Sequence, residues 1–381
     1  MIMETNSPAA GSTPPAPSAA RARSTPPAAR RGFGIYYWVL GIGLVLSLIV
    51  SARVGAVPIS FDHIGLFLKH ALGFGRGDGP PTIEEQLFLQ IRLPRVLLCA
   101  LTGAALSVSG VLMQALFRNP IVEPGLVGTS SGAAFGAAFV FVMGRTLTGA
   151  WADVLGPWLL PLFAFAGGAL ATWLVYRLSN VFGKINVNTL LLAGIAVNAL
   201  AAGGTGFFSY IARDPQARSI VFWNLGTLSG ADWHNTALVT VTTGGGILLA
   251  LRYTKALNAL MLGETEAGYL GVRTRRLKTH ILFVNTLMVA VATSVVGVIA
   301  FVGLVVPHIL RLLGSSDNRF LVIASALLGA ILLNFADMLA RIIVAPSEFP
   351  IGVLTAFAGA PVFLYLLIRA NGKQQQGGFY A

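Results

Sequence analysis

Charged side chains are scarce in this chain of 381 residues, since Asp, Glu, Lys and Arg together make up 10% of it. Soluble domains carry about 25% of these residues. Hydrophobic residues reach 55%, and there are 44 glycines, a combination that suits helices packed closely in lipid. The composition therefore excludes an ordinary soluble protein and indicates an integral membrane protein.

Cysteine is almost absent. Cys99 is the only one, which excludes an intrachain disulfide and a cysteine-based metal cluster. The five histidines contain no pair with the H-x3-H spacing of a closed metal site. We therefore expect no metal ligand and no cofactor bound by this chain.

Signatures of catalysis are also missing. The motif G-x-x-x-x-G-K-[ST] does not occur, so the chain has no Walker A loop to hold nucleotide phosphates. A polytopic membrane enzyme would need a convergent nucleophile, base or metal group, and the sequence shows none. We expect the chain not to be an enzyme.

The formal net charge is nevertheless +12. The basic residues cluster in short loops between apolar runs, which is the positive-inside pattern of membrane proteins. They form no stripe with interleaved aromatic residues on a soluble face. Nucleic-acid binding is therefore not expected.

Residues 1–33 are rich in Ala, Pro, Ser and Thr, a composition typical of a disordered tail. The apolar run that follows is long enough to span a bilayer and is expected to be retained, with a cytoplasmic N-terminus. Residues 371–381 form a C-terminal tail, and 34–370 form the membrane domain.

Ten apolar segments have about the length that a bilayer span requires. They predict an all-α polytopic fold with both termini in the cytoplasm. The boundary between the seventh and eighth spans is open, with Gly297 or Gly303 at the turn. The outer segment 55–91 is predicted to contain a short interfacial helix. The predicted spans are 35–53, 93–116, 126–144, 155–178, 189–210, 235–252, 279–296, 298–313, 320–341 and 351–369.

The segment Arg92–Gly132, RLPRVLLCALTGAALSVSGVLMQALFRNPIVEPGLVGTSSG, carries the most specific pattern. Three further segments belong to the same resemblance: Asn188–Asn198, Phe301–Arg311 and Phe349–Phe363. Together with Phe222–Trp233, they resemble the FecCD/BtuC-type permease subunits of bacterial type II ABC importers, which carry ferric siderophores, haem or cobalamin. The resemblance covers roughly residues 36–370.

This resemblance implies a BtuC-like ABC importer permease fold in the bacterial inner membrane. It also implies a homodimer with a second copy of the chain, two ATPase subunits and one periplasmic substrate-binding protein. ATP and Mg would bind the partner ATPase subunit. The cargo would be haem or a ferric siderophore, and membrane lipid would surround the complex.

Arginines at the outer ends of two spans are the candidates for binding-protein docking. By resemblance, Arg92, Arg95 and Arg341 would dock carboxylates of the substrate-binding protein, because a guanidinium group pairs with a carboxylate bidentately. The alternative is that they only snorkel to the interface. Asp337 lies four residues before Arg341, so the two are expected to pair along a helix.

The longest inner loop is Arg252–Lys278, and its part near 256–271 resembles the family's coupling helices. Its sequence predicts two short helices, Ala256–Leu262 and Thr265–Leu270, which would fit a groove of the ATPase subunit. The residues expected to form the coupling site are Gly263, Glu264, Ala267, Leu270 and Gly271. A basic cytoplasmic connector is the alternative.

Two inner turns match the cytoplasmic gates of the resembling permeases. One contains Asn119, Pro120 and Ile121, and the other Val187 and Asn188. Tight turns alone would also explain these residue types.

The fifth span would line the central pathway by resemblance, with Asn198, Thr205, Phe208 and Arg213. An aromatic wall next to an arginine suits a porphyrin with anionic propionates, so haem is the first choice of cargo. Ferric siderophores and cobalamin stay open as alternatives.

A rival from another class is an ion-coupled secondary transporter. Such proteins place ionisable groups near the bilayer midplane. Here the acidic residues fall at or near predicted span ends, which disfavours the rival. They are Glu123, Asp153, Asp214, Asp232 and Asp337.

Overall fold

The computed structural model describes residues 33–55, 60–71, 82–149, 152–181 and 184–374. The predictions for the tail before residue 33 and for residues 375–381 lie outside the described residues. Over the described part the chain is almost entirely helical, which confirms the predicted fold class.

Seven helices of the described part are long and apolar enough to cross a membrane, and three shorter apolar helices accompany them. Together they account for the ten predicted spans. The bounds of these helices are α1 Phe33–Arg53, α4 Leu93–Phe117, α5 Thr129–Thr148, α6 Ala152–Ser179, α7 Val187–Ile211, α9 Trp233–Leu262, α11 Thr274–Val296, α12 Val302–Leu313, α13 Asn318–Ile343 and α14 Ile351–Gln374.

Shorter elements connect the spans. The expected interfacial helix is α2, and α8 and a small antiparallel hairpin were not predicted. Their bounds are α2 Phe61–Ala71, α3 Ile83–Leu87, the π-helical turn η2 Phe88–Arg92, the 3-10 turn η3 Pro124–Val127, α8 Asp214–Asn224, α10 Glu264–Tyr269, β1 Asn180–Val181 and β2 Lys184–Ile185.

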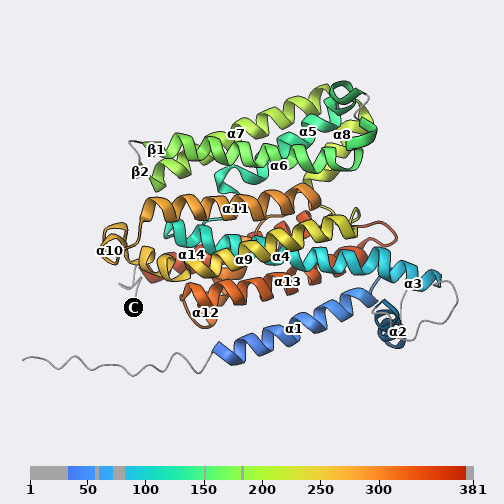
Figure 1. Ribbon diagram of the computed structural model, residues 1–381, viewed down its shortest axis with the longest axis horizontal. Helices are drawn as coiled ribbons and strands as arrows, with labels where there is room; N and C mark the ends of the chain where they lie inside the picture. Colours follow the sequence, from blue (N-terminus) through green and yellow to red (C-terminus); the bar gives the residue numbers. More distant parts are fainter. Residues whose placement is uncertain (1–32, 56–59, 72–81, 150–151, 182–183, 375–381) are drawn as a thin grey trace, which may run out of the picture.

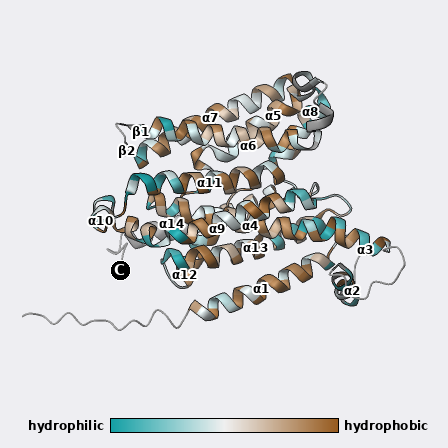
Figure 2. Cartoon of the chain, viewed as in Figure 1, coloured by the Kyte–Doolittle hydropathy of each residue, from teal (hydrophilic) through white to brown (hydrophobic). Residues whose placement is uncertain are grey.

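The long helices run roughly side by side in Figure 1, with α11 between the group α5, α6 and α7 and the group α4, α9 and α13. Helix α1 lies at the edge of the bundle. The hairpin and α10 lie at one end, and α2, α3 and α8 at the other. Figure 2 shows hydrophobic residues along most of each long helix and more hydrophilic residues at α10 and the start of α11.

Helix α4 is the centre of the fold, because most of its side chains are buried inside the chain. Two of its glycines allow other backbones to approach closely. A Cβ atom on Gly103 would lie 2.2 Å from the carbonyl oxygen of Gly329, and one on Gly110 would lie 1.8 Å from that of Gly303. Side chains cannot occupy these positions, which is the close small-residue packing found in membrane helices.

The structure corrects two predicted boundaries and decides between the two alternatives for a third. Helix α5 begins at Thr129, not near 126, because Gly128 adopts φ +90°. Residues 256–262 are not a separate helix but the last turns of α9. The seventh span ends at Gly297, with φ +77°, whereas Gly303 lies inside α12.

Candidate functional site

The three candidate docking arginines lie where α1, α4 and α13 meet. The Arg92 side chain is buried, and its Nη1 donates hydrogen bonds to the carbonyl oxygens of Ala52 at 3.2 Å and Arg53 at 3.0 Å. These carbonyls belong to the last turn of α1, whose C-terminal groups lack helical partners. Arg92 therefore ties the end of α1 to the start of α4.

Arg95 and Arg341 share one buried carboxylate. Arg95 Nη2 lies 2.8 Å from Asp337 Oδ1, and Arg341 Nε lies 3.0 Å from Asp337 Oδ2. The predicted pair between Asp337 and Arg341 along α13 is therefore confirmed. Arg341 also donates to the hydroxyl of Ser51 at 2.7 Å.

Glu348, in the connection before α14, completes this network by pairing with Arg95 Nη1. Its side chain is 40% exposed, whereas that of Asp337 is 1% exposed. Glu348 is thus the carboxylate that a partner at this end of the molecule could displace. Docking through the three arginines stays a prediction, because in this structure the chain's own groups hold them.

The candidate coupling segment is fastened to α11 by a buried lysine. Lys278 Nζ donates to Glu264 Oε1 at 2.6 Å and to the carbonyl oxygen of Ile185 in β2 at 2.8 Å. Burying an ammonium group is costly unless it is paired and hydrogen-bonded. Lys278 therefore holds α10, α11 and the hairpin before α7 together.

The other predicted coupling residues surround this contact. Gly263 and Gly271 adopt φ +145° and +79°, which lets the chain turn on both sides of α10. Ala267 is fully buried against the bundle, whereas Leu270 is exposed. Exposed Leu262 and Tyr269 lie close by in sequence. The apolar side chains form a surface that a partner subunit could cover.

The candidate gate residues form the turns that their types predict. Asn119 Oδ1 accepts a hydrogen bond from the Ile121 amide at 3.0 Å. In the second turn, Asn186 Oδ1 accepts from the amides of Asn188 at 2.9 Å and Thr189 at 3.2 Å. Asn186 caps α7 and was missed, although Asn is a preferred N-cap residue. A gating role for these turns stays a prediction.

The connection between α4 and α5 is held by side chains from elsewhere in the chain. Asn198 of α7 donates to the carbonyl oxygen of Leu126 at 3.2 Å, and Asn285 of α11 donates to that of Pro124 at 3.4 Å. Asn198, predicted to line the pathway, therefore supports the backbone of η3. Non-helical backbone in a membrane domain needs such partners.

A second irregular segment contacts the same connection. Glu123 Oε1 accepts a hydrogen bond of 2.9 Å from the amide of Phe301, which adopts φ +67° between α11 and α12. No pattern in the sequence joins these residues, which are 178 positions apart. An acidic residue between two apolar spans was the only available signal.

The aromatic residues of α7 divide between two faces. Phe208 is 9% exposed and packs against Phe135 and Phe139 of α5, with ring centroids 5.7 Å and 5.6 Å away. Phe207 and Tyr210 are 59% and 88% exposed. A pathway role for Phe208 stays a prediction, and Phe207 and Tyr210 are the exposed aromatic residues beside it.

The two remaining pathway candidates lie on α7 and at the start of α8. Thr205 Oγ1 donates back to the Ala201 carbonyl oxygen at 2.9 Å within its own helix. Arg213 is exposed at the N-terminus of α8, where its amide donates to Gln216 Oε1 at 3.0 Å. Among the described residues, no group of three or more His, Cys, Asp or Glu side chains is placed to hold a metal ion.

The geometry describes a bundle of long apolar helices, and known proteins resemble this chain over most of its length. The hemin transport system permease protein HmuU of Yersinia pestis is 39% identical over 348 residues, covering 89% of this chain and 97% of that protein. The vitamin B12 import system permease protein BtuC of Klebsiella pneumoniae is 39% identical over 291 residues, covering 76% and 85%. The cobalamin import system permease protein BtuC of Halobacterium salinarum is 40% identical over 360 residues, covering 86% and 94%.

A solved structure described as an inward-facing conformation of a metal-chelate type ABC transporter superposes with a TM-score of 0.72 at 29% identity. The match covers 88% of this chain and 99% of that one. The FecCD transport family matches residues 43–369, which confirms the family predicted from Arg92–Gly132. The chain belongs to the FecCD transport family and is a multi-pass permease subunit of an ABC importer.

Proposed function

We propose that this permease imports haem, as a homodimer that works with two ATPase subunits and one periplasmic substrate-binding protein. The exposed face of α7 carries the proposal, because it presents two aromatic side chains, Phe207 and Tyr210, and leads to the exposed Arg213. Aromatic rings suit a flat apolar porphyrin, and a guanidinium group suits its propionates.

The same face supports the homodimer. Its apolar side chains extend over the length of the helix and need lipid or a second copy to cover them. A pathway between two copies of α7 would place matching aromatic residues on both sides of the cargo, as the symmetry of a two-fold interface requires. The exposed large apolar residues of α7 are Leu192, Ile195, Leu200, Phe207, Tyr210 and Ile211.

The end of the molecule with α10 is assigned to the cytoplasm. Arg252, Lys255, Arg273, Arg275 and Arg276 lie at or near this end, and basic residues favour the cytoplasmic side. Figure 1 places the start of α1 at the same end. There the exposed apolar residues of α10 would enter the ATPase subunit, and Lys278 would carry its movement to α11 and the hairpin.

Docking of the substrate-binding protein is assigned to the opposite end. Arg95 pairs with the partly exposed carboxylate of Glu348, while the buried Asp337 holds both Arg95 and Arg341. A carboxylate of the binding protein would take the place of Glu348 at Arg95. Such charge pairs orient a complex as well as attract it.

Cobalamin is the second candidate cargo, because permeases for it reach the same identity to this chain as the hemin permease does. The test is transport into liposomes that contain the chain with its cognate ATPase, with the binding protein added outside. We expect ATP-dependent accumulation of haem and none of cobalamin or of a ferric siderophore. Accumulation of either competitor in place of haem would overturn the cargo and leave the family assignment intact.

An ion-coupled mechanism is tested in the same liposomes. Without ATP, an imposed proton or sodium gradient is expected to drive no haem uptake. Uptake under a gradient alone would support the rival class of secondary transporter.

A further inference from the structure

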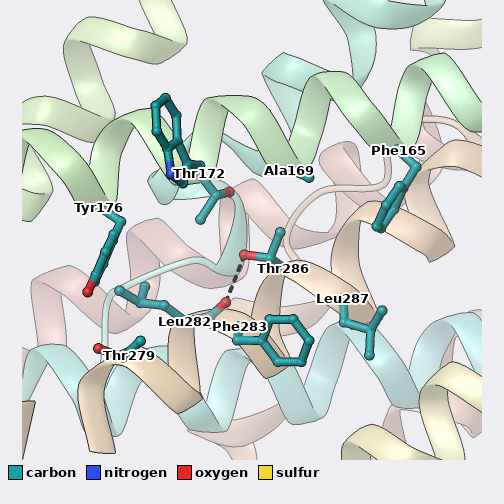
Figure 3. A pocket seen from close by; sticks show the side chains of 10 residues that line it. Phe165, Ala169, Thr172, Tyr176, Thr279, Leu282, Phe283, Thr286 and Leu287 are labelled. Carbon is teal, nitrogen blue, oxygen red and sulfur yellow. Dashed lines mark hydrogen bonds between the residues drawn. The ribbon is translucent and has the colours of Figure 1, made fainter. Parts of the chain in front are cut away.

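A groove of about 240 Å³ lies between α6 and α11, where the two groups of helices meet. Figure 3 shows side chains of both helices pointing into it, with Phe165 at one end and Tyr176 and Thr279 at the other. Its walls are almost entirely apolar. An apolar groove that runs between two helices fits a hydrocarbon chain better than a polar solute.

The groove opens to the surface of the bundle. Trp173 of α6 and Phe283 of α11 both line it and are more than half exposed. Trp is enriched at the depth where acyl chains meet lipid headgroups. The groove therefore lies open to the acyl chains of the surrounding bilayer.

Arginines gather at the end of the groove that holds Tyr176 and Thr279. Arg177 follows Trp173 by one helical turn, and its guanidinium carbon lies 5.7 Å from the centroid of the Trp173 ring. Arg275 and Arg276 precede Thr279 by one turn and so share its side of α11. All three arginines are exposed.

We propose that this groove binds an anionic phospholipid, with one acyl chain between α6 and α11 and the phosphate held by Arg177 and Arg276. Basic pockets between transmembrane helices on the cytoplasmic side are suited to anionic headgroups. The proposal uses the orientation assigned above, in which α10 faces the cytoplasm. It does not depend on which cargo is carried.

The site would strengthen the contact between the two groups of helices. Helix α6 packs with α5 and α7, α11 packs with α4 and α9, and α6 and α11 also pack directly against each other beside the groove. An acyl chain between them would fill space that the protein leaves empty, and the headgroup would bridge the two helices with charge-assisted hydrogen bonds.

The test is native mass spectrometry of the purified complex of the chain with its cognate ATPase, titrated with phosphatidylglycerol or phosphatidylcholine of equal chain length. We expect tight binding of one phosphatidylglycerol per chain and much weaker binding of phosphatidylcholine. The Arg177→Gln/Arg276→Gln double variant should weaken phosphatidylglycerol binding by about fivefold for each arginine removed, since a basic residue near an anionic surface contributes about 1 kcal/mol.

The matched control is Arg252→Gln/Arg319→Gln, which removes two exposed arginines at the same end from helices that do not line the groove. The control should bind phosphatidylglycerol as the native chain does. Equal losses in both double variants would show unspecific attraction and overturn the proposal. Competition by inorganic phosphate at millimolar concentration would assign the arginines to a free anion instead of a lipid.

Two further variants test the groove itself. Ala169→Phe fills it without changing charge and should abolish retention of the acyl chain, whereas unchanged binding would contradict the assigned position. Phe283→Cys reports what covers the groove, because Cys99 is buried and is the only native cysteine. Efficient cross-linking between two copies at this position would show that a second chain occupies the groove and would overturn the proposal.

Discussion

The ammonium group of Lys278 lies 2.6 Å from a carboxylate oxygen of Glu264 and joins a transmembrane helix directly to α10. The same group holds the hairpin through the Ile185 carbonyl oxygen. Three elements at this end of the bundle, the hairpin, α10 and α11, thus share one buried cation.

Lys278→Met should uncouple ATP hydrolysis from transport. The thioether cannot donate to Glu264 or Ile185, so a movement of α10 would no longer reach α11. We expect the ratio of haem transported to ATP hydrolysed to fall by roughly tenfold, which is a typical size for coupling between sites. The ratio is measured in liposomes with the binding protein present.

The matched control for this variant is Lys255→Met, which removes an exposed lysine from α9 near the same end. It should leave the transport ratio unchanged. A normal ratio for Lys278→Met, with protein of normal stability, would show that α10 transmits movement by another contact.

Glu348→Gln should tighten docking of the substrate-binding protein. The native Glu348 carboxylate pairs with Arg95 and repels a carboxylate of the binding protein. The neutral amide of Gln binds Arg95 more weakly and repels that carboxylate less. Because a partly exposed ion pair contributes at most about 1 kcal/mol, we expect an affinity gain of about threefold. Glu84→Gln, at an exposed carboxylate of α3 at the same end, is the control, and binding is measured by surface plasmon resonance at several salt concentrations.

A weaker complex for Glu348→Gln would instead mean that Glu348 itself contacts the binding protein. If the affinity for the substrate-binding protein does not change with salt concentration in either variant, the three arginines do not dock that protein. These two results can be separated, because the first keeps the salt dependence and the second abolishes it.

Asp337→Asn should destabilise the membrane domain strongly. The variant leaves Arg95 and Arg341 without the buried carboxylate that they share, and breaking a buried ion pair costs about 3–5 kcal/mol. We expect a marked fall in the temperature at which the detergent-purified protein aggregates. Asp232→Asn, at the exposed cap of α9, should cost less, since Asn is also a good N-cap residue.

The two neighbouring phenylalanines of α7 should respond differently to truncation. Phe208→Ala removes a buried ring and should cost about 3–5 kcal/mol of stability. Phe207→Ala should leave stability nearly unchanged and lower the rate of haem transport. Thermal unfolding and transport are measured for both variants. A Phe208→Ala protein with native stability and reduced transport would contradict the assignment of Phe208 to the packed core and of Phe207 to the pathway.

The spans were predictable because each needs a long apolar run, and only the bilayer imposes that length. Which face of α7 is buried in the chain's own bundle was not predictable. A helix that meets lipid or another subunit on one side and its own bundle on the other is apolar all round, so no periodicity separates Phe207 from Phe208. Tertiary packing decides which ring is buried.

The contacts of Glu123 and Lys278 were unpredictable for another reason. Each joins segments that are remote in the sequence or too short to have a periodic pattern, such as the two-residue strands of the hairpin. Glu264 was identified by resemblance, whereas its partner was not, because a lysine in a basic loop looks like one more positive-inside residue. The pairing of Asp337 with Arg341 was predictable because helical spacing alone brings them together.

The hydrogen bond between Glu123 and the Phe301 amide has a consequence for how the bundle can change shape. It joins the connection between α4 and α5 to the connection between α11 and α12. Neither connection can rearrange without leaving a carboxylate or an amide unpaired in an apolar interior. Conformations in which only one of the two connections has moved are therefore high in free energy. The stable conformations are those in which the polar groups of both connections are hydrogen-bonded. We therefore expect the bundle to pass between a few well-defined shapes, with little time spent between them.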